Sequence, residues 1–255
     1  MNNQEQEQQK ENKNIEEEKT NNSPYEIKVK QSNKQGLKQP RCVEDDILPK
    51  APIGILAIGR SGSGKTNAVV NMLDNELLLK GYFQDIYMMT DTNPDETLIK
   101  DLKLKKENII SDFTEEDVKK ILNENEKIIE QKGFNKSRRI LLVFDDILSN
   151  QKFLKSKTAT KLASANRHYN VSYIMCSQYF KKVPPVIRTN ARYYILFASS
   201  MNETEKMAEE LCCANMSKKQ FIKYFQHATR ERYSFMTINT ESECPLRRLF
   251  DNILL

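Results

Sequence analysis

The chain has 255 residues, of which 38% are hydrophobic, and a formal net charge of +5, so it is long and apolar enough to build one sizeable core. Its longest apolar runs are far shorter than the ~20 residues that a membrane span needs, which argues against a membrane segment. Residues 1–20 are polar almost throughout and do not resemble a signal peptide, so we expect a soluble, intracellular protein.

Residues 1–45 are predicted to form a disordered tail, and residues 46–255 a folded domain. The tail is rich in Gln, Asn, Glu and Lys, and it holds too little apolar surface to offset the entropy lost on ordering. It carries nine acidic and eight basic residues, so the basic excess lies in the domain. The basic part of the tail, from Lys28 to Arg41, either contacts phosphate backbones or is a solvated linker, and the sequence leaves both readings open.

Strand-like and helix-like segments alternate along the domain. Short apolar runs predict strands at 53–59, 85–90, 139–146, 171–177, 193–198 and 233–239. Apolar residues at helical spacing predict helices at 65–80, around Leu98 and Leu102, from Thr114 to Gly133, and at 152–169, 203–212 and 218–225. Strands without polar alternation are buried on both faces, as in parallel sheets. We therefore predict an α/β fold, with a mostly parallel open sheet flanked by helices.

A glycine-rich segment, Gly59-Arg60-Ser61-Gly62-Ser63-Gly64-Lys65-Thr66, joins the first predicted strand to the first predicted helix. It fits the pattern G-x-x-x-x-G-K-[ST] of a phosphate loop, in which backbone N–H groups converge on nucleotide phosphates at a helix N-terminus. In such a loop Lys65 reaches the β- and γ-phosphates, and the Thr66 hydroxyl binds Mg²⁺. The segment therefore predicts a site for ATP and Mg²⁺.

Two acidic residues, Asp145 and Asp146, follow the apolar run of a central strand. Ligands of open α/β sheets bind at the carboxyl ends of the strands, where the phosphate loop also emerges. Asp145 is placed to hold Mg²⁺ through water, and Asp146 to orient or deprotonate the attacking water. Beyond the next strand, Gln178 is placed to contact that water and the γ-phosphate, and so to sense which nucleotide is bound.

The segment from Arg167 to Gln178, the run Pro184-Pro185-Val186-Ile187-Arg188-Thr189-Asn190 and the strand end Phe144-Asp145-Asp146 together resemble the FtsK/HerA superfamily of DNA-pumping ATPases. Within that superfamily they look most like the poxvirus-type genome-packaging ATPases of large DNA viruses, virophages and Polinton-like elements. The resemblance covers about residues 50–240 and implies a P-loop NTPase with a RecA-like sheet. An Asp at position 146, where the superfamily more generally has a Glu, is a departure that leaves the identity of the base open.

The resemblance also implies roles for particular residues. It makes Gln178 the sensor and Arg167 the arginine finger that enters the neighbouring subunit's site, where a planar, permanently charged fork stabilises the transferring phosphoryl group. Arg188 is a second candidate for the finger. Lys181 and Lys182 follow Gln178, and in a ring of subunits they are placed to carry positive charge toward DNA.

The function implied is an ATP-driven motor that translocates double-stranded DNA, as a homo-oligomeric ring of six subunits, into a capsid through a capsid or portal partner. Such a protein works in the host cytoplasm or nucleus, with association to the virion. A helicase or partition ATPase is an alternative, although we see no additional DNA-binding domain. A kinase would need an arginine-rich lid, which the sequence does not show. A nucleotide-dependent switch or scaffold without motor activity remains as an alternative from another class.

Overall fold

The protein is described here from a computed structural model, over residues 39–44, 46–90, 104–212, 216–242, 245–250 and 252–254. The expected tail lies mostly outside these residues, and the helix expected around Leu98 and Leu102 lies entirely outside them. The boundary between tail and domain therefore stays a prediction. Within the described residues, no helix combines the length and the apolar composition that a membrane crossing requires.

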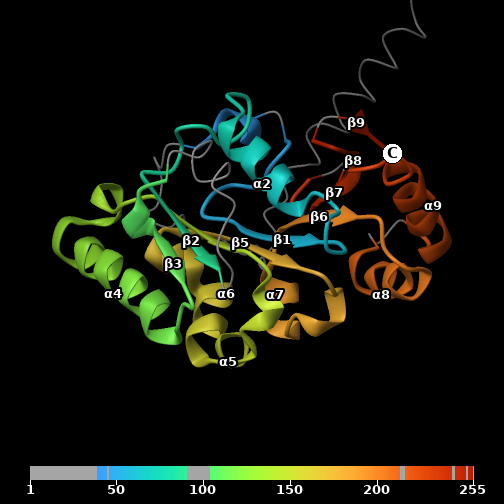
Figure 1. Ribbon diagram of the computed structural model, residues 1–255. Coiled ribbons are helices and arrows are strands. Elements are labelled where there is room, and N and C mark those ends of the chain that lie inside the picture. The colour runs from blue at the N-terminus through green and yellow to red at the C-terminus, as the bar shows by residue number, and fades with distance from the viewer. Residues whose placement is uncertain are drawn as a thin grey trace, which may run out of the picture. The chain divides into compact units, whose positions relative to one another are not determined.

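The architecture is built on one sheet (Figure 1). Its strands are β1 (Gly54–Ile58), β2 (Asp85–Thr90), β3 (Ile109–Ser111), β4 (Ile140–Phe144), β5 (Val171–Ser177), β6 (Tyr193–Phe197), β7 (Phe235–Asn239), β8 (Leu246–Arg248) and β9 (Asn252–Ile253). Among the described residues, these nine strands pair in the order β3-β2-β4-β5-β1-β6-β7-β8-β9. The strands from β3 to β6 in this order are parallel, and β7, β8 and β9 are antiparallel to their neighbours. The α/β, mostly parallel, RecA-like fold is thereby confirmed.

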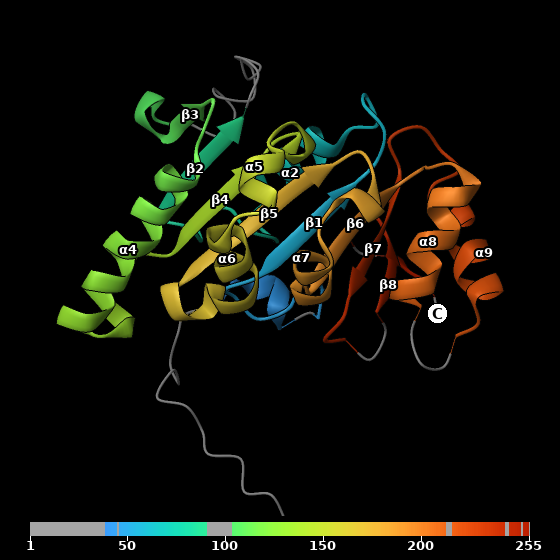
Figure 2. The ribbon, with the colours of Figure 1, turned by 90° about the horizontal axis from the view of Figure 1, so that it is seen from below.

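Helices cover both faces of the parallel strands (Figure 2). Helix α2 (Lys65–Asp74) lies on one face, and α4 (Glu115–Lys132), α5 (Gln151–Leu154), α6 (Lys157–Tyr169) and α7 (Pro185–Asn190) lie on the other. Helices α8 (Met201–Leu211) and α9 (Lys218–Ala228) pack together toward the β7–β9 side (Figure 1). Two hydrophobic clusters result, one on each face, and β1, β4 and β5 are buried along their whole length between them. This double burial explains why these strands show no polar alternation.

The helix boundaries differ from the predicted ones where local hydrogen bonds compete with the helix. Helix α2 ends at Asp74, short of the expected Lys80, because the Asn75 side chain accepts a hydrogen bond of 2.8 Å from the Leu77 backbone N–H. The helix expected over 152–169 is two helices, α5 and α6. Ser156 is the N-cap of α6, and its hydroxyl oxygen accepts a hydrogen bond from the Ala159 N–H.

Other boundaries match the sequence signals. Helix α4 begins with a capping box between Thr114 and Asp117 and ends at Gly133, whose φ of 82° suits glycine. The strand expected to be last, at 233–239, is followed by β8 and β9, which are too short for periodicity to reveal.

Gly54 in β1 allows a close approach between the two central strands. It pairs with Tyr173 of β5, and a Cβ atom at Gly54 would lie 2.4 Å from Cζ of that ring. Tyr173 is fully buried, so the ring has little room to move. The strand that carries the phosphate loop is thus held against its neighbour by a contact that only glycine permits.

We predict that Gly54→Ala lowers the free energy of unfolding by about 1–3 kcal/mol, because overpacking forces the strands or the ring apart. Denaturant titration measures this change. In the background of Tyr173→Leu, which removes the ring, the same substitution should cost clearly less. Equal costs in both backgrounds would contradict the proposed contact.

Candidate active site

The phosphate loop follows β1 and wraps around the N-terminus of α2. The Gly59 N–H donates a hydrogen bond of 3.0 Å to the Ser177 carbonyl oxygen at the end of β5, which fixes the beginning of the loop. Gly62 and Gly64 have φ values of 71° and 97°, a region that glycine enters without strain. The Ser63 hydroxyl oxygen is buried and has no hydrogen-bond partner among the described residues. The segment has the turn geometry and the unpaired donor that suit an anion.

Lys65 points back into this loop. Its Nζ donates to the carbonyl oxygens of Gly59 and Arg60, at 2.7 and 3.0 Å, and the residue is 9% exposed. A buried ammonium group needs such acceptors, because its desolvation is costly. The side chain is thereby held where it faces anything that the loop N–H groups bind.

Thr66 and Asp145 meet although they lie far apart in the sequence. The Thr66 hydroxyl lies 3.3 Å from Asp145 Oδ1, and the Asp145 backbone N–H is fixed by a hydrogen bond of 3.0 Å to the Met89 carbonyl oxygen on β2. Burial raises the pKa of Asp145, while the Thr66 hydrogen bond and the Lys65 charge oppose the shift. A hydroxyl and a carboxylate beside a phosphate loop are hard oxygen ligands that fit Mg²⁺.

Asp146 and Gln178 also come together, as their strand positions predict. Strand β5 lies between β4 and β1, so the residues that follow the three strands share one edge of the sheet. Gln178 Nε2 lies 3.2 and 3.4 Å from the two carboxylate oxygens of Asp146. Asp146 has a φ of 46°, and its carbonyl oxygen accepts hydrogen bonds from the Ser149 N–H and hydroxyl. This turn holds the Asp146 carboxylate against Gln178.

Arg167 lies at the amino ends of the parallel strands, whereas the phosphate loop lies at their carboxyl ends. It sits near the end of α6, just before the amino end of β5, and its Nη2 lies 3.3 Å from Glu241 Oε1. Glu241 also pairs with Arg192, which precedes β6. Arg167 is therefore placed away from the phosphate loop of its own chain.

The surroundings of Arg188 indicate a structural role. Its side chain is 8% exposed and makes two hydrogen bonds, of 2.8 and 2.9 Å, to the Glu210 carboxylate on α8, and it also donates to the Val183 carbonyl oxygen. The ring of Phe180 lies under the guanidinium. Lys181 and Lys182 are both exposed, and Lys181 pairs with the same Glu210. Of the two finger candidates, Arg167 thus remains the more accessible.

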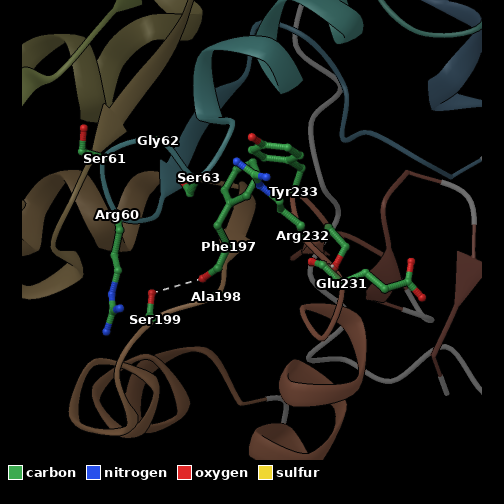
Figure 3. Close-up of a pocket in the computed structure, with 11 residues that line it drawn as sticks. Arg60, Ser61, Gly62, Ser63, Phe197, Ala198, Ser199, Glu231, Arg232 and Tyr233 are labelled. Carbon is green, nitrogen blue, oxygen red and sulfur yellow. Dashed lines mark hydrogen bonds between the residues drawn. The ribbon is translucent and has the colours of Figure 1, made fainter.

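A cavity of about 290 Å³ beside the phosphate loop contains residues that no sequence motif marks (Figure 3). It is lined by Arg60–Ser63 of the loop, by Phe197–Ser199 at the end of β6 and by Glu231–Ser234 before β7. No pattern in the sequence marks the residues Glu231–Ser234, because only the antiparallel pairing of β7 with β6 brings them to the loop.

The site and the strand order define a P-loop NTPase fold with a RecA-like sheet. In this sheet β5 separates β1, which precedes the phosphate loop, from β4, which precedes Asp145 and Asp146. The chain belongs to the family described as "Poxvirus A32 protein", whose sequence model matches residues 42–244. The resemblance predicted from the sequence is thereby confirmed.

Relatives and solved structures agree with this assignment. The chain is 28% identical over 170 residues to the "DNA packaging protein OPG160" of Variola virus and of Vaccinia virus (strain Western Reserve), covering 64% of this chain and 60% of each relative. It therefore matches less than two thirds of the length of these curated relatives. The B204 DNA-packaging ATPase of Sulfolobus Turreted Icosahedral Virus aligns with a TM-score of 0.54 at 17% identity, over 79% of this chain and 98% of that one. B204 of Sulfolobus turreted icosahedral virus 2, in complex with AMPPCP, aligns with a TM-score of 0.54 at 15% identity, over 78% and 97%. At such identities the likeness concerns the fold.

We predict that Asp145→Asn uncouples stability from activity. The raised pKa means that folding favours the protonated form of Asp145 over the ionised carboxylate. The contribution of Asp145 to stability is therefore greatest below the ordinary pKa of 3.8, and it is lost as the pH rises through the pKa of the folded state. The variant should be at least as stable as the parent at pH 7, with a flatter pH dependence, while nucleotide hydrolysis falls by roughly 10²-fold or more. Denaturant titrations between pH 4 and 8 measure the stability, and the exposed Asp74→Asn is the control. A less stable variant with unchanged pH dependence would contradict this account.

Arg188→Ala should instead destabilise the fold, because Glu210 keeps only Lys181 as a cationic partner and the Val183 carbonyl oxygen loses its side-chain donor. We expect a loss of about 2–3 kcal/mol, below the 3–5 typical of fully buried pairs because Glu210 is partly exposed. Thermal unfolding compares it with Arg167→Ala, which should be within about 0.5 kcal/mol of the parent. Similar stabilities of the two variants would remove the structural role of Arg188.

Proposed function

We propose that this protein is an ATP-driven motor that translocates double-stranded DNA, packaging a viral or virus-like genome into a capsid. The observation that carries the proposal is the gathering of Lys65, the Thr66–Asp145 pair and the Asp146–Gln178 pair at one edge of the sheet. The names of the OPG160 and B204 proteins supply the packaging role, which this chain takes by its similarity to them.

The residues suit hydrolysis of ATP to ADP and phosphate. The loop N–H groups and Lys65 hold the phosphates and stabilise charge on the transferring phosphoryl group. A Mg²⁺ ion held by Thr66 and, through water, by Asp145 would add positive charge beside the β- and γ-phosphates. Asp146 accepts the proton of the attacking water as the bond to the γ-phosphorus forms and the bond to the β-phosphate oxygen breaks. Gln178, hydrogen-bonded to Asp146, then reports the loss of the γ-phosphate.

The position of Arg167 supports its action in trans. It lies at the edge opposite the phosphate loop, so a neighbouring subunit whose loop faces that edge would receive the guanidinium. A ring, which we take to have six subunits, repeats this contact at every site.

The working protein would bind double-stranded DNA in the ring and a capsid or portal protein outside it. It would act in the cytoplasm or nucleus of the host cell or with the virion.

The loop after Gln178 is proposed to contact the DNA. Lys181 and Lys182 follow the sensor within a 3-10 turn, Phe180–Lys182, and the Phe180 backbone N–H is fixed by Glu203 at 3.0 Å. Since Lys181 is paired with Glu210, the exposed Lys182 carries the main part of the proposed contact with phosphate.

We predict that long double-stranded DNA raises steady-state ATP hydrolysis several-fold. Lys65→Ala should lower hydrolysis by roughly 10²-fold or more, because the phosphoryl charge loses its main cation. Arg167→Ala should poison assemblies when mixed with the parent, because each variant subunit leaves a neighbour without its finger. Glu241→Gln is the matched control, since it removes the ion pair of Arg167 and keeps the arginine. Lys182→Ala should weaken only the stimulation by DNA.

Each contrary result points to a different error. If DNA does not change the rate of hydrolysis, the protein is still an ATPase, but the result contradicts the packaging function and favours a nucleotide-dependent switch or scaffold. Activity that falls in simple proportion to the fraction of Arg167→Ala subunits would remove the trans finger. Unchanged stimulation in Lys182→Ala would exclude the loop after Gln178 as the DNA contact.

A further inference from the structure

Tyr233 lines the cavity beside the phosphate loop, and packing in the core does not explain its backbone conformation. Its side chain is half exposed, yet its φ is 66°, a left-handed conformation that is a true outlier for a bulky residue. Such strain persists where the surrounding structure imposes it, and it gathers at binding sites. Tyr233 therefore marks this cavity as a candidate site.

The turn that carries Tyr233 is fixed in place. The Ser234 N–H and hydroxyl both donate to the Glu231 carbonyl oxygen, at 3.2 and 2.7 Å, which closes the turn. The Glu231 carboxylate lies 2.6 Å from Nη2 of Arg248 on β8, which anchors the turn to the sheet. The aromatic ring is thus preorganised.

One edge of the Tyr233 ring lies beside Gly64 of the phosphate loop, and the preceding residue in the chain, Arg232, supplies a cation. Tyr233 Cδ1 would lie 3.2 Å from a Cβ atom on Gly64, so a side chain at Gly64 would displace it. The guanidinium of Arg232 lies over the ring, 4.7 Å from its centre. Figure 3 shows the ring beside the Gly62–Ser63 segment, with Arg232 next to it and Arg60 directed away.

The direction of a bound nucleotide follows from the rest of the site. Asp145, Asp146 and Gln178 lie on the β4 and β5 side of the loop and mark the end where the γ-phosphate reacts. A nucleotide is linear, so its base must leave on the other side of the loop, toward β6 and β7. The cavity with Tyr233 lies on that side.

We infer that Tyr233 is the platform on which the purine base of ATP stacks, on the ring face that Arg232 does not cover. This inference rests on the proposed function, whose nucleotide it places. An aromatic ring stacks on a base face without hydrogen-bond readout of the base, and the cation–π contact of Arg232 on the other face holds the ring in place. The site therefore favours large purine faces over pyrimidines and selects weakly between adenine and guanine.

The test measures binding to the full chain by calorimetry, with Mg²⁺ and no DNA. The ligands are the non-hydrolysable analogue AMPPCP and inorganic tripolyphosphate, which has no base. Tyr233→Gly is the main variant, because glycine adopts the backbone conformation at φ 66° without strain and the fold is preserved. We expect AMPPCP to bind it about 5- to 100-fold more weakly, as base–aromatic stacking implies, while tripolyphosphate binds as to the parent.

Two further variants separate the roles of ring and cation. Tyr233→Phe keeps the stacking face and should restore AMPPCP binding to within about twofold of the parent. Arg232→Ala should weaken AMPPCP binding but not tripolyphosphate binding, and Arg230→Ala, an exposed arginine that does not line the cavity, is its control.

The outcomes distinguish this inference from the proposed function. Unchanged AMPPCP binding in Tyr233→Gly would place the base elsewhere and overturn the inference. An equal loss for both ligands would mean that the variant disturbs the phosphate loop, and it would overturn it as well. Absence of stimulation by DNA would count against packaging and leave a base-specific loss at Tyr233 intact.

Discussion

The parallel pairing of β1, β5 and β4 is the constraint on which the candidate site depends. Parallel strands end at the same edge, so the residues after each carboxyl end meet there: the loop after β1, Gln178 after β5, and Asp145 and Asp146 after β4. The pairing is rigid because all three strands are buried on both faces. Thr66 and Asp145, which are 79 positions apart in the sequence, thus lie within hydrogen-bond distance of each other.

The burial of polar groups at this edge of the sheet costs folding free energy. Lys65 is nearly buried and is satisfied by two loop carbonyl oxygens, and Asp145 is held by Thr66 against a burial that raises its pKa. A structure selected only for stability would replace such groups. Their retention beside a turn rich in glycine is the physical signature of a site arranged for an anionic ligand and a divalent cation.

The sequence predicted the parts of the molecule that follow from local rules. Apolar periodicity and capping predict the strands at 85–90 and 171–177 and the capped helix from Thr114 to Gly133. They also place Gln178 after the strand next to the one that ends at Asp145 and Asp146. It missed what depends on particular contacts: the early end of α2 at Asn75, and β8 and β9, which are too short to have a period. It also missed the surroundings of Arg188, because no local signal reveals that Glu210 lies opposite, and it missed Tyr233, which antiparallel pairing alone brings to the loop.

Strand β7 directly connects the side of the sheet at the carboxyl ends of the parallel strands with the side at their amino ends. It begins just after Tyr233, beside the phosphate loop, and ends just before Glu241, which pairs with Arg167 at the opposite edge. Because β7 runs antiparallel to β6, one short strand reaches both edges, whereas a parallel strand would need a crossover to do so. On the roles proposed here, the base of one subunit's nucleotide and the finger offered to the next subunit act on the two ends of a single rigid element. In the proposed ring, a small shift of that strand would couple neighbouring sites without a moving domain, because close-packed interiors transmit strain.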